Sequence, residues 1–191
     1  MNYLAHLFLA GDSAESLIGN LAGDFVKGPV DGRFSPGVAE GIRNHRRVDA
    51  FTDAHPSVAA FRRLLVPEHG HYARIIADVF FDHFLVHRWS DYRDEPLDAF
   101  LARVFATIDP QAALLPGRLA AVYPRMRDEG WLASYGDVAS IRTALHHLSY
   151  RLSRRPQLET ATRHLIDSRA ELEAHFVDFF PDVMAHSRIA S

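Results

Sequence analysis

The chain has 191 residues, of which 48% are hydrophobic and 24% are charged, and this balance is typical of a globular protein rather than a disordered one. No apolar run approaches the roughly 20 residues of a membrane-spanning helix, so we expect no membrane segment. The formal net charge of -3 argues against a nucleic-acid-binding protein. The chain contains no cysteine, which excludes disulfides and thiolate zinc sites and fits the cytoplasm.

Two further features of the composition bear on chemistry. Lys27 is the only lysine among the 21 basic residues, and arginine suits carboxylate and phosphate partners, although GC-rich coding explains the bias equally well. The 12 histidines hint at metal or proton chemistry.

Helical spacing of apolar residues recurs along the whole chain, and alternating patterns are nearly absent. Ser13 opens a helix that Gly28 ends, and Ser35 with Pro36 opens the next. No linker is long enough to separate domains, so the sequence predicts one compact all-α domain over 1–191. The predicted helices span residues 2–10, 13–27, 36–54, 56–65, 70–90, 95–107, 117–129, 137–153 and 158–180.

The segment around Asp78, Asp82 and His83 predicts a buried helix that carries charge. Its other residues are apolar nearly all round, which is typical of a central helix. Asp78 and Asp82 lie one turn apart, and two buried carboxylates with an imidazole need partners. A divalent cation would supply them. The alternative is that the carboxylates pair with arginine and His83 is an ordinary core histidine.

A second set of potential ligands recurs at helical spacing. His45, Asp49 and Asp53 follow each other at intervals of four residues and therefore share one face. Imidazole and carboxylate are suitable ligands for manganese, iron, magnesium or zinc. The adjacent Arg46 and Arg47 could hold a phosphate. The alternative is an exposed helix with pairs such as Arg46 and Asp49.

A third group lies near the N-terminus. Asn20 and Asp24 share a helical face among apolar neighbours, while Gly19 and Gly23 allow another backbone to approach closely. These residues could equally mark a tight helix crossing. His6 lies in an apolar first helix and could face the same interior.

Common catalytic motifs are missing from the sequence. It has no GxxxxGK[ST] loop, no GxGxxG after a strand, no GxSxG and no HExxH. Nucleotide-driven, dinucleotide-dependent and serine-hydrolase functions are therefore disfavoured. An all-α protein rich in His and Asp physically suits metal-assisted hydrolysis of a phosphate ester.

Several segments in the same order resemble the acyl carrier protein phosphodiesterases over essentially the whole length. They are Met1-Asn2-Tyr3-Leu4-Ala5-His6-Leu7, Gly19-Asn20-Leu21, Asp24-Phe25-Val26, Gly41-Ile42, His45-Arg46-Arg47-Val48-Asp49, Thr52-Asp53, Asp82-His83-Phe84-Leu85, Ser153-Arg154-Arg155-Pro156, His175-Phe176 and Phe179-Phe180-Pro181.

The resemblance implies an activity and a cofactor. The activity is hydrolysis of the phosphodiester between 4'-phosphopantetheine and a serine of holo-acyl carrier protein, which gives apo-acyl carrier protein and 4'-phosphopantetheine. The cofactor is a divalent cation, typically manganese. The family is also related to the HD-type metal-dependent phosphohydrolases. The pair here reads Asp82-His83 rather than His-Asp, so ligands are not transferred from that wider group by register.

Spacing and family chemistry together give expected roles. In these, Asp49 or His6 orients water or relays a proton, and Arg46 and Arg47 steady the phosphate. The expected metal ligands come from Asp24, His45, Asp78, Asp82 and His83.

An acidic carrier protein needs a basic docking surface, and its prosthetic arm needs an aromatic groove. The candidate arginines form two groups, Arg62, Arg63 and Arg74 or Arg151, Arg154 and Arg155. The candidate groove walls are Trp89, Trp131 and Tyr135.

Two other functions fit the same residues. One is an HD-like phosphohydrolase acting on a nucleotide or another small phosphoester. The other is a non-catalytic helical binding module whose His and Asp clusters are structural.

Overall fold

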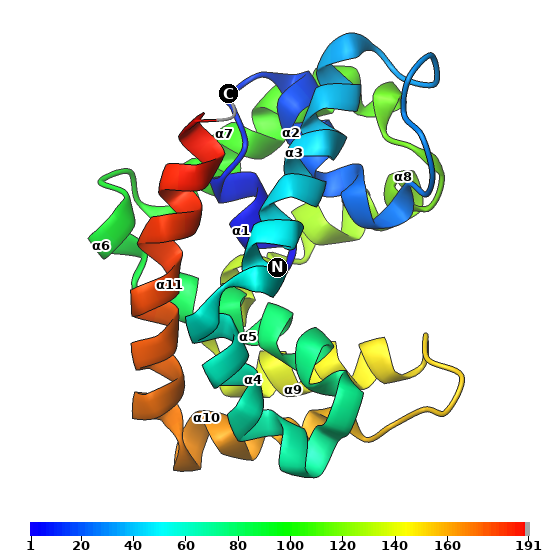
Figure 1. Cartoon of the computed structure of the whole chain (residues 1–191). Helices are drawn as coiled ribbons and strands as arrows, with labels where there is room; N and C mark the ends of the chain where they lie inside the picture. Colours follow the sequence, from blue (N-terminus) through cyan, green and yellow to red (C-terminus); the bar gives the residue numbers. More distant parts are fainter. Residues whose placement is uncertain (190–191) are drawn as a thin grey trace.

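The computed structural model describes residues 1–189, and helices dominate it (Figure 1). The α-helices are α1 (Tyr3–Phe8), α2 (Ala14–Ala22), α3 (Pro36–Ala54), α4 (Pro56–His69), α5 (Ala73–His87), α6 (Trp89–Tyr92), α7 (Leu97–Ile108), α8 (Gly117–Asp128), α9 (Val138–Ser149), α10 (His164–Asp167) and α11 (Arg169–Ile189). Short 3-10 helices are η1 (Gly23–Phe25), η2 (Gly70–Tyr72), η3 (Asp109–Leu114), η4 (Ala133–Gly136) and η5 (Leu158–Arg163).

This architecture confirms the all-α prediction, since residues 1–189 contain no β-strand. The buried side chains form one connected core, as expected for a single domain. None of the described helices is both long and apolar enough to span a membrane. The expected domain also included residues 190–191, which lie outside the described residues.

The predicted boundaries hold best where proline and capping residues mark them. The helix predicted over 36–54 is observed as α3. The helix predicted over 13–27 instead ends at Ala22 and tightens into η1, where Gly23 packs against a histidine ring.

The last predicted helix, over 158–180, is divided in the structure. It begins as η5, where Thr160 and Thr162 bond the carbonyls three residues earlier and favour the tighter turn. The main helix α11 then runs from Arg169 through Pro181 to Ile189. Proline marks a boundary in sequence patterns, but here it lies inside the helix.

Helix α5 forms the centre of the fold, as its apolar sequence predicts. Ten of its residues, from Ala73 to Leu85, are buried. It packs against α1, α4, α9 and η4, and Figure 1 shows it between these elements. Phe61 of α4 meets Phe81 and Phe84 edge-on. A fully buried Phe side chain contributes about 1.5–3 kcal/mol to the free energy of unfolding, so this aromatic cluster stabilises the packing of α4 against α5.

Helices α2 and α3 make the most extensive contact in the molecule because two glycines face each other. A Cβ atom on Gly19 would lie 2.4 Å from the Val38 carbonyl oxygen and 2.7 Å from the Gly41 Cα. A Cβ on Gly41 would lie 2.7 Å from the Ser16 carbonyl oxygen. The backbones can approach this closely only without these side-chain atoms.

We expect Gly19→Ala to lower the free energy of unfolding by about 1–2 kcal/mol, measured by urea denaturation. Alanine gains about 1 kcal/mol over glycine in helix propensity, but the new methyl group meets backbone atoms that cannot rotate away. A matched control is Gly11→Ala, whose Cβ would have its closest contact at 3.3 Å, with the Ser16 hydroxyl. Stabilisation of the Gly19→Ala protein would contradict the crossing geometry.

Candidate metal centre

Two histidines and a carboxylate from α1 and α3 converge in the interior. The rings of His6 and His45 stack with their centroids 3.6 Å apart. Asp49 connects them, with Oδ1 3.3 Å from His6 Nε2 and Oδ2 3.2 Å from His45 Nε2. Both histidines are buried, while about a quarter of the Asp49 side chain is exposed. The ligand atoms of these three residues lie within 4.8 Å of one another, which is close enough to share one cation.

Local packing fixes the orientation of the His45 ring. Its Nδ1 lies 2.8 Å from the Asn20 carbonyl oxygen, so Nδ1–H donates to that oxygen and Nε2 points the other way. Nε2 then faces Asp49 and, at 3.5 Å, Asp24. Gly23 makes room for the ring, because a Cβ there would lie 2.1 Å from His45 Cγ. The observed glycine and the carbonyl together aim one imidazole nitrogen at two carboxylates.

The electrostatics of the cluster follow from this arrangement. Burial lowers the pKa of His45, but hydrogen bonding to Asp24 and Asp49 outweighs it and raises the pKa to about 9. Burial and the neighbouring His45 lower the pKa of His6 to about 4. Burial opposes the charge of Asp49, yet its two histidine partners hold its pKa far below the usual range. Near pH 7 the positive charge beside these carboxylates is carried by His45 and by the Met1 amino group, so a metal ion would bind His45 by displacing its Nε2 proton.

Asp24 and Asp78 flank the cluster on two sides. Asp24 lies in η1 and is largely exposed, while Asp78 lies in α5 and is mostly covered. The amino group of Met1 is 2.9 Å from Asp49 Oδ1 and 3.2 Å from Asp78 Oδ1. Burial raises the pKa of Asp78. The structure thus brings together four predicted site residues from α1, η1 and α3 and places Asp78 beside them.

Asp82 has a different set of partners. Its side chain is fully buried, and its oxygens accept hydrogen bonds from the backbone N–H groups of Leu4 at 2.9 Å and Ala5 at 3.0 Å. These amides belong to the first turn of α1, whose own N-cap residue, Asn2, supplies no side-chain bond. Asp82 therefore caps α1 from α5 and positions His6 in the next turn. We do not include it among the proposed ligands.

His83, the next residue along α5, contacts a different set of elements. Its Nδ1 is 2.8 Å from the Tyr135 carbonyl oxygen, and its Nε2 is 3.1 Å from the Arg169 guanidinium. An arginine N–H can only donate, so Nε2 accepts and His83 is neutral. Burial lowers its pKa to about 4, which agrees with that state. His83 connects α5 to η4 and α11, and we do not include it among the ligands.

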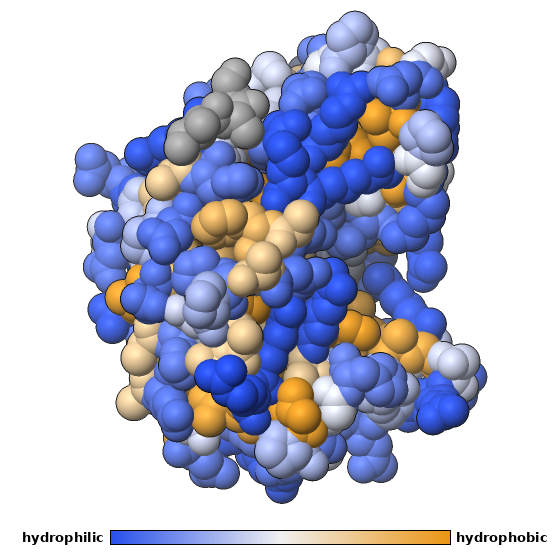
Figure 2. Space-filling model, in the orientation of Figure 1, coloured by the Kyte–Doolittle hydropathy of each residue, from blue (hydrophilic) through white to orange (hydrophobic). Residues whose placement is uncertain are grey.

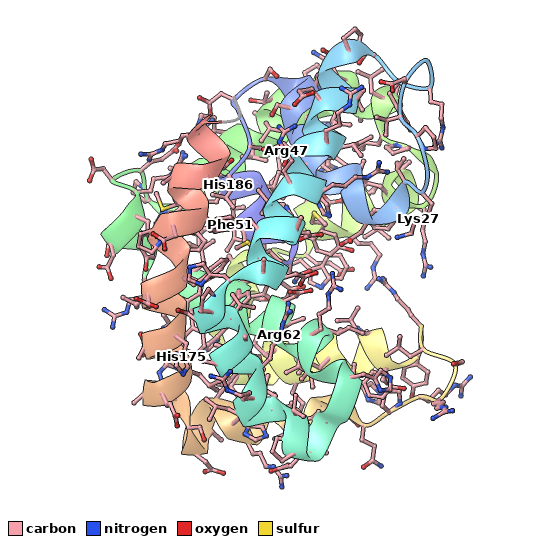
Figure 3. All side chains as sticks on the ribbon, in the orientation of Figure 1. Lys27, Arg47, Phe51, Arg62, His175 and His186 are labelled. Atoms are coloured by element: carbon pink, nitrogen blue, oxygen red, sulfur yellow. The ribbon has the colours of Figure 1, made fainter. Side chains whose placement is uncertain are left out.

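The two predicted phosphate-binding arginines also have other partners. Arg46 donates to the carbonyl oxygens of Val26 and Gly28, at 3.0 and 2.9 Å, and so holds the segment that follows Asp24. Arg47 pairs with Glu40 at 2.9 Å, and Figure 3 shows it on α3. Neither side chain is directed to the cluster by these contacts.

A pocket of about 330 Å³ opens beside the cluster. Asp24 and Asp78 line it, as do the exposed arginines Arg118 and Arg151. Its other lining residues are Met1, Asn2, Tyr3, Phe25, Ile75, Val79, Leu148 and Leu152. Figure 2 shows the surface hollowed on this side of the molecule, between α8 and the end of α9. The pocket lining therefore combines two carboxylates and two guanidinium groups with mostly apolar side chains.

Sequence patterns do not predict that Arg118 lines this pocket, and they indicate Arg151 only as a docking residue. Arg118 lies at the start of α8 and Arg151 follows α9, so no local spacing connects them. Tyr3 belongs to the opening motif, which does not reveal its place in the pocket lining. Its ring stacks on those of Phe25 and Trp131, with a centroid distance of 6.3 Å in each case. Only the folded chain brings these side chains together.

The donor set fits a divalent cation. His45 Nε2 points at carboxylates, and the two buried ring nitrogens of His6 make no hydrogen bond of normal geometry. Two imidazoles and a carboxylate suit manganese, iron or zinc, and Asp24 can complete the set. A cation at this point would satisfy His6 Nε2, a nitrogen that the protein leaves without a hydrogen bond.

Comparison with known proteins gives a consistent result. The family model described as acyl carrier protein phosphodiesterase matches residues 1–183. The chain belongs to the acyl carrier protein phosphodiesterase family. Proteins named acyl carrier protein phosphodiesterase are 36% identical in Serratia proteamaculans, covering 98% of both chains, and 37% identical in Shigella boydii, covering 98% of this chain and 97% of that protein.

A third relative with the same name, from Photorhabdus laumondii, is 35% identical over 96% of this chain and 93% of its own. No solved structure matches the chain.

We expect Asp82→Ala to lower the free energy of unfolding by about 2–4 kcal/mol, because two buried amides of α1 lose their acceptor. Asp82→Asn keeps one acceptor oxygen and should lose less. Chemical denaturation of both proteins measures this. Equal stability of the alanine variant and the wild type would show that α1 does not depend on the cap.

Asp82 also predicts a pH dependence. Burial raises its pKa to about 7, although the Leu4 and Ala5 amides lower it. The folded protein then keeps a proton that the unfolded chain releases near pH 4, so the contribution of Asp82 to stability falls as the pH rises from about 4 to about 7. The unfolding free energy of the wild type minus that of Asp82→Asn should fall by roughly 4 kcal/mol across this range. A constant difference would mean that the carboxyl group is ionised throughout.

Proposed function

We propose that this protein hydrolyses the phosphodiester between 4'-phosphopantetheine and the serine of holo-acyl carrier protein, releasing apo-acyl carrier protein and 4'-phosphopantetheine. The observation that carries the proposal is the buried His6–His45–Asp49 cluster beside a pocket lined by two arginines without a carboxylate partner in residues 1–189. Membership of the family supports the choice of substrate. The absence of cysteine agrees with a cytoplasmic location.

We propose that His6, His45 and Asp49 hold a divalent cation, with manganese the metal that the family resemblance favours. Such a cation polarises the phosphodiester and lowers the pKa of bound water. Asp24 and Asp78 flank the cluster and can orient the attacking water by accepting its hydrogen bonds. The Asn20 carbonyl keeps His45 in one tautomer, and Asp82 keeps α1 in place.

Arg118 and Arg151 are suited to bind the phosphodiester oxygens. Neither has a carboxylate partner among the ion pairs of residues 1–189, and Arg151 hydrogen-bonds the Tyr3 hydroxyl beside the pocket. They line the same pocket as Asp24 and Asp78. Charged hydrogen bonds from arginine stabilise negative charge on phosphate, and more so as that charge grows during reaction.

The pantetheine arm then has a defined path. A second, smaller hollow shares Asn2, Tyr3, Leu148 and Arg151 with the pocket. Its remaining lining residues are Trp131, Tyr135, Ala144 and His147. This wall is apolar with polar edges and matches an arm of amide and methylene groups. Trp89, also expected as a wall, is instead a core residue whose indole N–H donates to the Glu95 carbonyl at 2.7 Å.

The carrier protein itself would dock around the pocket mouth. Of the two arginine groups expected there, Arg62 and Arg74 both pair with Asp53, at 2.9 and 2.6 Å. The group after α9, which includes Arg151, is exposed and adjoins the pocket. Figure 3 shows Lys27 on the same side of the molecule. We assign docking of an acidic partner to this side.

The direct test is intact-protein mass spectrometry of holo-acyl carrier protein incubated with the enzyme, with manganese or with chelator. A loss of about 340 Da from the carrier protein that requires metal is the expected result. No loss with any metal, together with release of phosphate from nucleotides, would contradict the proposal and favour the small-phosphoester alternative. Inactivity on both, with no bound metal, would favour a binding module.

We expect Arg118→Ala and Arg151→Ala each to lower kcat/KM for holo-acyl carrier protein about tenfold or more, because a charged hydrogen bond to phosphate contributes roughly 1.5–3 kcal/mol. A matched control is Arg125→Ala, which removes an arginine of α8 that pairs with Glu129 on the surface. Steady-state assays of the three proteins decide the point. Unchanged kinetics for the first two variants would remove both arginines from the site.

A further inference from the structure

A second group of ligand atoms lies at the C-terminal end of α4. This end is the one away from α3 and the candidate metal centre. Glu68 and His69 end α4, and His164 begins α10. One ligand atom from each residue lies within 4.8 Å of the other two. Figure 1 shows α10 and the end of α4 at the lower edge of the molecule, away from the N-terminus. None of these residues belongs to the site proposed for hydrolysis.

The two histidines carry ring nitrogens that the protein does not satisfy. His164 is only 8% exposed, and its Nε2 makes no hydrogen bond. The Nε2 atom of His69 is also buried without a hydrogen bond. The two rings meet edge-on with centroids 5.5 Å apart, and His164 Nε2 lies 3.7 Å from Glu68 Oε2. Buried polar atoms without partners are rare, and two that converge on a carboxylate indicate a missing ligand.

The charge state of the cluster agrees with metal binding. Burial lowers the pKa of both His69 and His164, so both imidazoles are neutral near pH 7 and each can present a lone pair. Glu68 also pairs with Arg163, which neutralises the carboxylate in the absence of a metal. A metal ion would take over that role, while Arg163 is exposed and free to turn toward solvent.

We propose that Glu68, His69 and His164 form a second cation site, with Zn²⁺ as the best match. Two imidazoles and one carboxylate are a known zinc donor set. Glu68 and His69, but not His164, also line a surface pocket of about 520 Å³ with Tyr72 and Gln157, and this pocket would give the ion access from solvent. Because the ligands come from α4 and α10, the ion would cross-link these two helices. It would also stabilise η5, which packs on α9.

The test is isothermal titration calorimetry of the His45→Ala protein with Zn²⁺ as the only ligand. The His45→Ala substitution weakens Zn²⁺ binding at the candidate metal centre, so that the second site can be measured. We expect one Zn²⁺ per chain, and adding His164→Gln or His69→Gln should weaken its binding by about 100-fold or more, because each removes a ligand. His71→Gln is the matched control, since His71 is an exposed neighbour outside the cluster. Failure of the His45→Ala protein to bind Zn²⁺, or unchanged binding in the two variants, would overturn the proposal.

A measurement on the wild-type protein guards against variants that do not fold. Zn²⁺ titration followed by long-range ¹H–¹⁵N correlation of the histidine rings should shift His69 and His164 in addition to His6 and His45. Shifts confined to His6 and His45 would contradict the second site. Cleavage of holo-acyl carrier protein is not a readout here, so this proposal and the proposed function can fail separately.

Discussion

The candidate metal centre depends on one buried carboxyl group. The Asp82 side chain extends from the central helix α5, and its oxygens accept hydrogen bonds from the backbone amides of Leu4 and Ala5 in α1. Helix α1 has only six residues and lacks a cap of its own, so it has little intrinsic stability. Held in this way, it presents His6 to the His45 ring and Tyr3 to the pocket. A helix too short to be stable alone therefore holds two side chains of the candidate site in place.

The second constraint is the absence of side chains at three glycines. Gly19 and Gly41 let α2 approach α3, and Gly23 gives the His45 ring its place. Each of these positions costs helix propensity, roughly 1 kcal/mol relative to alanine. The same close packing places the Asn20 carbonyl against His45 Nδ1 and fixes which ring nitrogen faces Asp49. Backbone geometry therefore sets the chemistry of the imidazole.

Much of this could be predicted from the sequence, because helical periodicity and proline or glycine boundaries are local signals. The charged central helix and the pairing of His45 with Asp49 both follow from spacing. Spacing does not show which element of the fold supplies the hydrogen-bond partner of a buried polar group. Asp82 binds backbone amides 77 and 78 residues away, and His83 binds a carbonyl and an arginine from other elements. Arg118 and Arg151 line one pocket only because the chain folds back on itself.

The central claim is that His6, His45 and Asp49 hold the cation. The most direct measurement is an anomalous-difference map from crystals of this protein grown with Mn²⁺, with data collected at the manganese absorption edge. The account predicts a peak in contact with His6, His45 and Asp49. A peak bounded by Asp82 and His83 instead, or no peak between α1 and α3 in crystals of active enzyme, would contradict it.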